Sequence, residues 1–121
     1  MPASSTLTTY SPDKLIAGHQ TTHDLKVTVI TGQNLVRGAV VGMITASGKY
    51  NLSLSAAADG SQTPVGILVD DTDATAADKE ALIYTTGDFN QAALTLGAAH
   101  TLASIKAGLA DRSIFLIPVQ A

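Results

Sequence analysis

Two histidines near the N-terminus have the spacing of a metal-binding pair. His19 and His23 are four residues apart, as in helices that hold zinc between two histidines. Such helices carry a glutamate directly after the first histidine, and this chain has Gln20 there. The neighbouring residues are rich in threonine and glycine, which are poor helix formers. We therefore expect no metal site at this pair.

The other residues that might do chemistry lack the partners that the chemistry needs. His100 stands alone just before a predicted helix, where a histidine usually makes a local hydrogen bond. A calcium loop starting at Asp71 would need glycine at its sixth position and glutamate at its twelfth, where the chain has Ala76 and Leu82. Residues 70–79 are therefore interpreted as a solvated loop. With no cysteine, there is no thiolate ligand or thiol nucleophile. We expect neither enzymatic activity nor a cofactor.

One lysine has the position of a modified residue. Lys49 lies at the tip of a predicted hairpin, where small, strand-rich carrier domains bear biotin or lipoate on a lysine. The flanking Met-Lys-Met or Asp-Lys-Ala pattern of those domains is absent, since Lys49 stands between Gly48 and Tyr50. A plain solvated lysine is favoured, and a swinging-arm carrier domain is kept as an alternative.

The charge of the chain is low and evenly spread. Only 14% of its 121 residues are charged, against roughly 25% in typical soluble domains, and the net charge is -3. The few basic residues are scattered singly and aromatic residues are rare, so direct binding of nucleic acid is not expected. The longest apolar stretch is far below the about 18 residues of a membrane span. A surface with so few charges is easily desolvated, which favours oligomerisation or docking on a larger assembly.

The N-terminal part of the chain differs from the rest. Residues 1–24 are polar, carry Pro2 and Pro12 and show neither helical nor strand periodicity, so they are interpreted as a flexible arm. Residues 25–121 form the predicted domain. Short apolar segments follow one another there, separated by turn residues.

The segments of the domain are mostly predicted strands. Residues 25–29 alternate between apolar and polar, residues 39–44 and 50–54 indicate a hairpin, and residues 65–69 follow Pro64. Residues 81–84 form a further strand that is expected to turn at Gly87 and Asp88. Thr101 caps one predicted helix, and residues 114–117 close the chain as a strand. The expected fold is mainly β with one short C-terminal α-helix: a compact small β-barrel or sandwich with an extended N-terminal arm.

Three motifs resemble the lambda-type phage head decoration family. They are LVRGAVVG at 35–42, PVGIL at 64–68 and GDFN at 87–90 with Leu94 after it. The helix and the closing strand follow in the same order. The resemblance implies a homotrimer on the outer surface of the expanded head, bound to the major capsid protein at threefold and quasi-threefold sites. It also implies a late protein, made in the host cytoplasm, that stabilises the virion mechanically.

The resemblance also implies roles for particular residues. The arm would pair with capsid strands, through the segment of high β-propensity Thr6, Leu7, Thr8, Thr9 and Tyr10. In the domain the implied roles are structural: Gly38, Gly66 and Gly87 permit turns or close packing, Phe89 anchors the sheet, and Asn90 satisfies loop backbone groups. Arg37 would face a neighbouring subunit, the capsid or solvent. A non-viral β-rich adaptor remains a second alternative.

Overall fold

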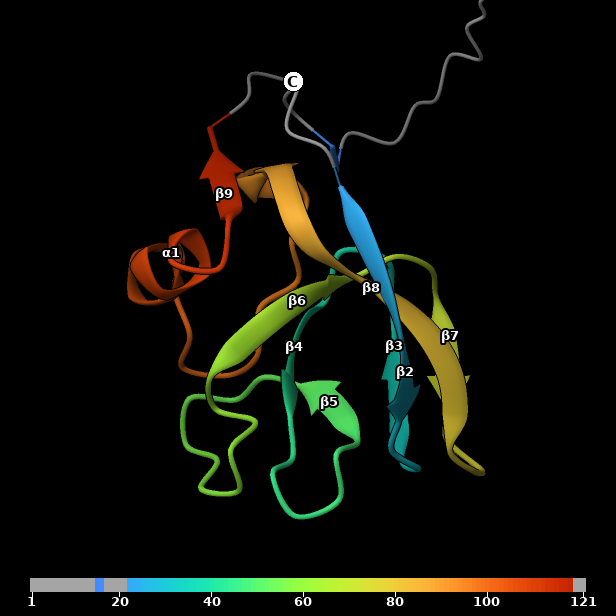
Figure 1. The fold of residues 1–121 in the computed structure, drawn as a ribbon. Helices are drawn as coiled ribbons and strands as arrows, with labels where there is room; N and C mark the ends of the chain where they lie inside the picture. Colours follow the sequence, from blue (N-terminus) through green and yellow to red (C-terminus); the bar gives the residue numbers. More distant parts are fainter. Residues whose placement is uncertain (1–14, 17–21, 119–121) are drawn as a thin grey trace, which may run out of the picture.

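The structure, a computed structural model, describes residues 15–16 and 22–118. Figure 1 labels its strands and the helix α1. In chain order the elements are β2 (His23–Val29), β3 (Gln33–Leu35), β4 (Val40–Met43), β5 (Tyr50–Leu52), β6 (Pro64–Leu68), β7 (Thr72–Ala74), β8 (Lys79–Asn90), the 3₁₀ turn η1 (Gln91–Ala93), α1 (Leu102–Ala110) and β9 (Ile114–Ile117). The fold is mainly β with one short helix near the C-terminus, as predicted. The predicted arm segment Thr6–Tyr10 and His19 lie outside the described residues.

The large sheet closes on itself to form a small barrel. Its strand order is β2-β5-β4-β6-β8-β9. A further antiparallel pairing of β2 with β8 closes the first five of these strands into a ring. That pairing sets Leu25 opposite Ile83 and Val29 opposite Lys79. β9 lies outside the ring and pairs in parallel with the last residues of β8. The expected hairpin is confirmed, since β4 and β5 pair antiparallel with Val41 opposite Leu52.

β8 is the longest strand and contradicts the predicted turn at Gly87 and Asp88. It runs without interruption from Lys79 to Asn90. Gly87 bends the backbone, with φ of 142°, yet it still pairs with Ile114 of β9. The strand continues because new partners take over along its length: β2 and β6 flank its first part, and β9 flanks its last part. A glycine that marks a turn in isolation is here a bend within a paired strand.

The region predicted as a solvated loop, residues 70–79, also contains a strand. β7 pairs antiparallel with β3, with Leu35 opposite Thr72 and Asn34 opposite Asp73, in a separate two-stranded sheet. Ala74 is fully buried. Asp73 turns the chain after β7, because its Oδ1 accepts hydrogen bonds from the backbone N and the hydroxyl of Thr75. These bonds hold the pKa of Asp73 below its ordinary value.

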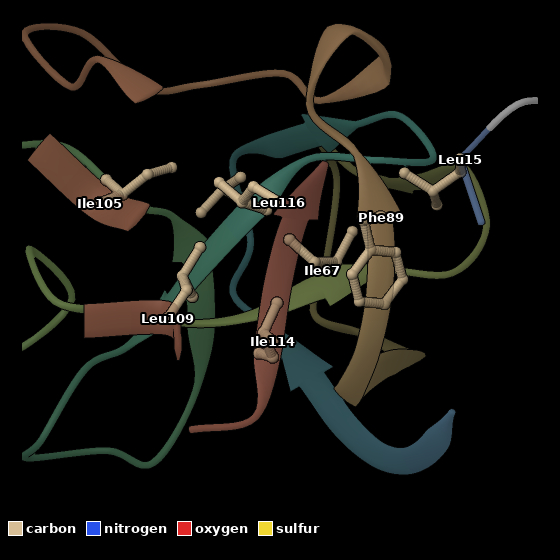
Figure 2. Close-up of a cluster of buried hydrophobic side chains, with 8 residues drawn as sticks. Leu15, Ile67, Phe89, Ile105, Leu109, Ile114 and Leu116 are labelled. Atoms are coloured by element: carbon tan, nitrogen blue, oxygen red, sulfur yellow. The ribbon is translucent and has the colours of Figure 1, made fainter. Parts of the chain in front are cut away.

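Two apolar cores lie on opposite faces of β4 and β6. Val40 and Ile67 point to one face, whereas Val41 and Leu68 point to the other, as alternation along a strand requires. The first core, here called the helix-side core, contains Leu15, Val40, Ile67, Phe89, Ile105, Leu109, Ile114 and Leu116 (Figure 2). The second, the barrel core, contains Val27, Val29, Leu35, Ala39, Val41, Leu68, Ala74 and Ile83. Burial on both sides explains why residues 39–42 carry no polar side chain, whereas Met43, at the end of β4, is exposed.

The helix begins where the sequence predicts. Thr101 is its N-cap and accepts a hydrogen bond from the Ser104 backbone N at 3.1 Å, while Ser104 Oγ lies 2.9 Å from the Thr101 N. This reciprocal capping box satisfies two backbone donors at the helix start. Ile105 and Leu109 turn inward, and α1 packs against β9 and β6. The helix thereby covers the face of the sheet that the barrel leaves open.

Candidate functional site

The first described residues of the chain are attached to the end of β8. Leu15 is only 2% exposed and is a member of the helix-side core. Its carbonyl accepts a hydrogen bond of 2.7 Å from the backbone N of Asn90. Ile16 forms an antiparallel bridge with Phe89, although its side chain is largely exposed. The root of the predicted arm is therefore fixed on the central strand of the domain.

Phe89 and Asn90 form the platform beneath this root. The Phe89 ring is fully buried, and its centroid is 5.3 Å from that of Tyr84. Figure 2 shows Leu15 beside this ring, on the side away from the helix. Asn90 is also buried and caps η1, since its Oδ1 accepts a hydrogen bond from the Ala92 backbone N at 3.0 Å. Both residues hold chain segments together at the end of β8.

Glycines leave the space that this platform needs. Gly38 has φ of 93°, and a Cβ there would lie 2.6 Å from the Ala93 carbonyl oxygen and 3.7 Å from Leu15 Cδ1. At Gly87, a Cβ would meet Thr22 and the ring of Phe89 within 3 Å. Gly66 lets the Ile83 side chain come close to its backbone. A larger residue at Gly38 or Gly87 would disturb the root of the arm as well as the local backbone.

Arg37 is bound within its own domain. Its Nη1 donates to the Val69 carbonyl oxygen at 2.6 Å and to the Tyr84 hydroxyl at 3.4 Å, and the guanidinium lies 5.9 Å from the centre of the Tyr84 ring. Its backbone N donates to Asp71. These contacts link the β3–β4 connection to the residue after β6 and to the middle of β8. They favour a structural role for Arg37, in which it holds these segments together, over that of a solvated charge at a strand end.

The candidate catalytic residues are not arranged as a catalytic site. His23 is exposed on β2, and within residues 15–16 and 22–118 no three His, Cys, Asp or Glu side chains gather to hold a metal ion. His100 Nε2 lies 3.1 Å from Ser53 Oγ, so its hydrogen-bond partner is 47 residues away in the sequence and not local as expected. Ser53 is 0% exposed, so no substrate reaches its hydroxyl. This serine and histidine hold the residues that follow β5 against the segment before α1.

Lys49, the candidate modified lysine, is held by an ion pair. Its Nζ lies 2.7 Å from Asp78 Oδ2, and the Thr31 backbone N donates to Oδ1 of the same carboxylate at 2.8 Å. The bond from Lys49, and then that from Thr31, holds the pKa of Asp78 below its ordinary value of 3.8. The hairpin tip is thus tied to the β2–β3 turn, whereas a swinging arm needs a free lysine.

A groove lies beside β2 and β8. Its volume is about 400 Å³, and Lys26 Nζ lies 3.1 Å from Glu80 Oε1 at its rim. The groove is lined by Lys26, Asp70, Asp71, Thr72, Glu80, Ala81 and Leu82. Threonine, alanine and leucine together with paired charges supply neither a nucleophile with its base nor a cofactor cradle. No helix in the described part of the chain is long and apolar enough to span a membrane.

Comparison with known protein families identifies the family of this chain. The family model of the bacteriophage lambda head decoration protein D matches residues 8–117, almost the whole chain. The chain belongs to this head decoration family. A search of curated proteins finds no match. The family suspected from the three motifs is therefore confirmed.

Membership of the head decoration family fixes the role in broad terms. The protein is a structural component of a bacteriophage virion and decorates its capsid. The family is structural rather than enzymatic. Leu15 and Ile16 are the site residues that the sequence analysis missed. An apolar pair between the polar residues 11–14 and Gly18 was the available signal.

Proposed function

We propose that this head decoration protein stabilises the expanded phage head as a homotrimer bound to the outer surface of the major capsid protein. The trimer would occupy threefold and quasi-threefold sites, where neighbouring capsomers meet. The family match carries this proposal, because it extends over the whole described domain and into the predicted arm as far as residue 8.

The proposed mechanism is mechanical. Packaged DNA presses outward on the shell, and a trimer that straddles neighbouring capsomers adds contacts that must break before the capsomers separate. A surface of low charge suits this role, since little bound water and few ions must be removed when it is covered. No step of the mechanism needs a catalytic group, a cofactor or nucleic acid.

The proposed binding segment is the arm, predicted as residues 1–24 ahead of a domain of residues 25–121, although β2 already begins at His23. Residues Thr6–Tyr10 would add a strand to an exposed sheet edge of the capsid protein, in which main-chain hydrogen bonds provide the affinity. The support from the domain is the position of the arm's root, because Leu15 and Ile16 lie at the end of β8. Binding of the arm would thus be connected to the longest strand of the fold.

Different observations disfavour the two alternative functions, a carrier domain and a non-viral adaptor. The ion pair of Lys49 with Asp78 disfavours a carrier domain, whose lysine must move freely. A non-viral adaptor would share the barrel but bind no capsid, and the family match disfavours it.

Binding to heads tests the proposal. The full chain is expected to sediment as a trimer and to bind expanded heads but not compact procapsids, measured by co-sedimentation. Deletion of Met1 to Tyr10 should abolish attachment and leave the circular dichroism spectrum of the domain unchanged. Equal binding of the truncated and full chains would refute the arm mechanism, and a protein without affinity for any head would refute decoration.

A further inference from the structure

The connection between β5 and β6, residues 53–63, contains an aspartate followed directly by a glycine, Asp59 and Gly60 (Figure 1). No other Asp-Gly or Asn-Gly pair occurs in the sequence. Such a pair is chemically reactive in a flexible chain, because glycine has no Cβ to keep its backbone N away from the preceding carboxyl group. In the folded protein, hydrogen bonds hold both residues of the pair.

The reaction open to an Asp-Gly pair is isomerisation through a cyclic imide. The Gly60 N attacks the Asp59 Cγ, the new N–Cγ bond closes a five-membered ring, and the N–H proton leaves with the carboxyl OH as water. Water then adds to one of the two imide carbonyl groups. Addition at Cγ restores aspartate, whereas addition at the main-chain carbonyl breaks its bond to N and leaves isoaspartate. One water is released and one is taken up, and nothing is oxidised or reduced.

The attacking nitrogen is already engaged in the folded protein. The Gly60 N–H donates to the side-chain Oε1 of Gln62 at 2.8 Å. Attack requires the nitrogen to lose this proton and to move to the carboxyl carbon, so the bond to Gln62 must break first. The Gly60 backbone is also packed closely, since a Cβ there would overlap Thr45 Oγ1 and lie 3.1 Å from the Met43 carbonyl oxygen. Movement of the nitrogen is therefore opposed from two sides.

The carboxyl group is held in its unreactive form. Asp59 Oδ1 accepts hydrogen bonds from the Ser61 hydroxyl at 2.5 Å and from the Ser61 backbone N at 3.0 Å. These bonds hold the pKa of Asp59 below its ordinary value of 3.8, and an ionised carboxylate has no OH to lose as water. Ser61 is 1% exposed and its backbone packs against Gly42, so both donors are fixed in place.

From these contacts we infer that Asp59 and Gly60 form a latent isoaspartate site, which Gln62 and Ser61 keep unreactive in the folded protein. The inference is independent of how the protein binds the capsid. Isomerisation would insert the Asp59 Cβ into the main chain and shift Ser61 from its buried position. It would also disturb the hydrogen bond of 2.8 Å from the Thr45 backbone N to the Asp59 carbonyl oxygen. The β4–β5 turn would then lose its attachment to the connection after β5.

The protection is measurable as a rate of isomerisation. Reaction requires a local opening that breaks the bonds made by Gln62 and Ser61, and such an opened state is a minor population of the folded protein. One ordinary hydrogen bond changes an equilibrium of this kind about fivefold. The folded wild type should therefore isomerise at least about tenfold more slowly than the unfolded chain.

Ageing of the wild type and three variants, Gln62→Ala, Ser61→Ala and Gln33→Ala, tests the inference. Gln33 is the matched control, because its Oε1 also accepts a backbone N–H, that of Leu52 at 3.3 Å. Each full-length protein is incubated at the same pH and temperature, once in buffer, where circular dichroism shows it folded, and once in urea. Isoaspartate at residue 59 is measured by peptide mapping and by enzymatic methylation of the isoaspartyl carboxyl group.

The expected result is a faster reaction in two folded variants. Gln62→Ala and Ser61→Ala should each raise the rate about fivefold, and Gln33→Ala should change it less than twofold. In urea all four proteins should react at one rate. If the buried change Ser61→Ala prevents folding, Gln62→Ala decides alone, since Gln62 is only half-buried.

Three outcomes would overturn the inference. A folded wild type that isomerises as fast as the unfolded chain would mean that the fold gives no protection. Equal rates of folded Gln62→Ala and folded Gln33→Ala would mean that Gln62 has no special role. An acceleration of Gln62→Ala in urea as large as that in buffer would mean that the local sequence, and not the hydrogen bond to Gly60, sets the rate.

Discussion

The helix-side core and the barrel core use the same strands for different purposes. The barrel core is filled mostly by valine, alanine and leucine from paired strands, as the narrow interior of a small barrel requires. The helix-side core takes larger side chains, among them Phe89, from segments that are far apart in the chain: Leu15, α1 and β9. Only the helix-side core includes the root of the arm.

This difference shows how a small domain separates its scaffold from its attachment. Strand alternation in β4 and β6 supplies both cores from one stretch of backbone. The barrel core lies inside the closed sheet, and the helix-side core includes Leu15 as a buried member. Changes in the two cores should therefore alter stability similarly and head binding differently.

The strongest test substitutes one large residue in each core. Phe89→Ala should lower the free energy of unfolding by about 3–5 kcal/mol and Ile83→Ala by about 2–5 kcal/mol, because both leave cavities. Only Phe89→Ala also removes the ring beside Leu15, so under the proposed arm mechanism it should weaken head binding while the protein is still folded. Urea denaturation followed by circular dichroism gives the stabilities, and co-sedimentation gives the binding.

The comparison between the two cores needs a control, and one outcome would contradict it. Phe115→Ala serves as a control for aromatic removal, since Phe115 on β9 is 39% exposed and belongs to neither core, and it should cost less than Phe89→Ala. Loss of head binding in folded Ile83→Ala, to the same degree as in Phe89→Ala, would mean that the two cores are not functionally distinct.

A smaller effect is expected at Gly38, which borders the helix-side core. Gly38→Ala combines a positive φ with a clash against the Ala93 carbonyl oxygen, and should cost about 2–3 kcal/mol. Gly48→Ala is the matched control: Gly48 has φ of 74° and open space around it, so only the backbone term of about 1 kcal/mol remains. Thermal unfolding measures both, and equal losses would show that the space above Gly38 is unimportant.

Most elements of the fold were predictable because local patterns determine them. The alternation in residues 25–29, the apolar run at 39–44 and the capped helix after Thr101 all appear in the structure. β3 and β7 were missed, because three-residue strands among polar residues owe their existence to each other. The turn predicted at Gly87 was wrong for a related reason: β9, which comes much later in the chain, keeps β8 extended there.

The candidate site was less predictable than the fold. The motif residues Gly38, Phe89 and Asn90 could be chosen through family resemblance, but their contacts with Leu15 could not. Leu15 lies in a segment without periodicity, and its burial depends on a ring that is distant in the sequence. Periodicity reports contacts within one element, whereas a single anchored residue leaves no repeat to detect.

The helix cap provides a test at about 1 kcal/mol. Thr101→Ala removes the side chain that accepts the Ser104 N–H, and should destabilise the protein by about that amount. Thr63→Ala is a suitable control, since Thr63 is exposed and donates a hydrogen bond from its backbone N to the Gly60 carbonyl oxygen. Urea denaturation should show the loss only for Thr101→Ala. Head binding of the folded Thr101→Ala variant should be unchanged, because α1 lies at the far end of the helix-side core from Leu15.

The smallest predicted effect concerns the barrel end, where Asp78 joins Lys49 to the β2–β3 turn. Because the folded-state pKa of Asp78 lies below its ordinary value of 3.8, its contribution to stability is present above that pH and disappears as pH falls through the lower folded-state value. Asp78→Asn should therefore be slightly less stable than the wild type at pH 6, and the two curves of stability against pH should converge below pH 3.8. Asp70→Asn, for which the described residues show no side-chain hydrogen bond, is the control for loss of a surface carboxylate and should match the wild type at pH 6. A constant difference between Asp78→Asn and the wild type down to the acid limit would show that the carboxylate's charge is not what holds the hairpin tip. Unchanged head binding of Asp78→Asn would show that the ion pair between Lys49 and Asp78, like the barrel core, supports the fold and takes no part in capsid binding.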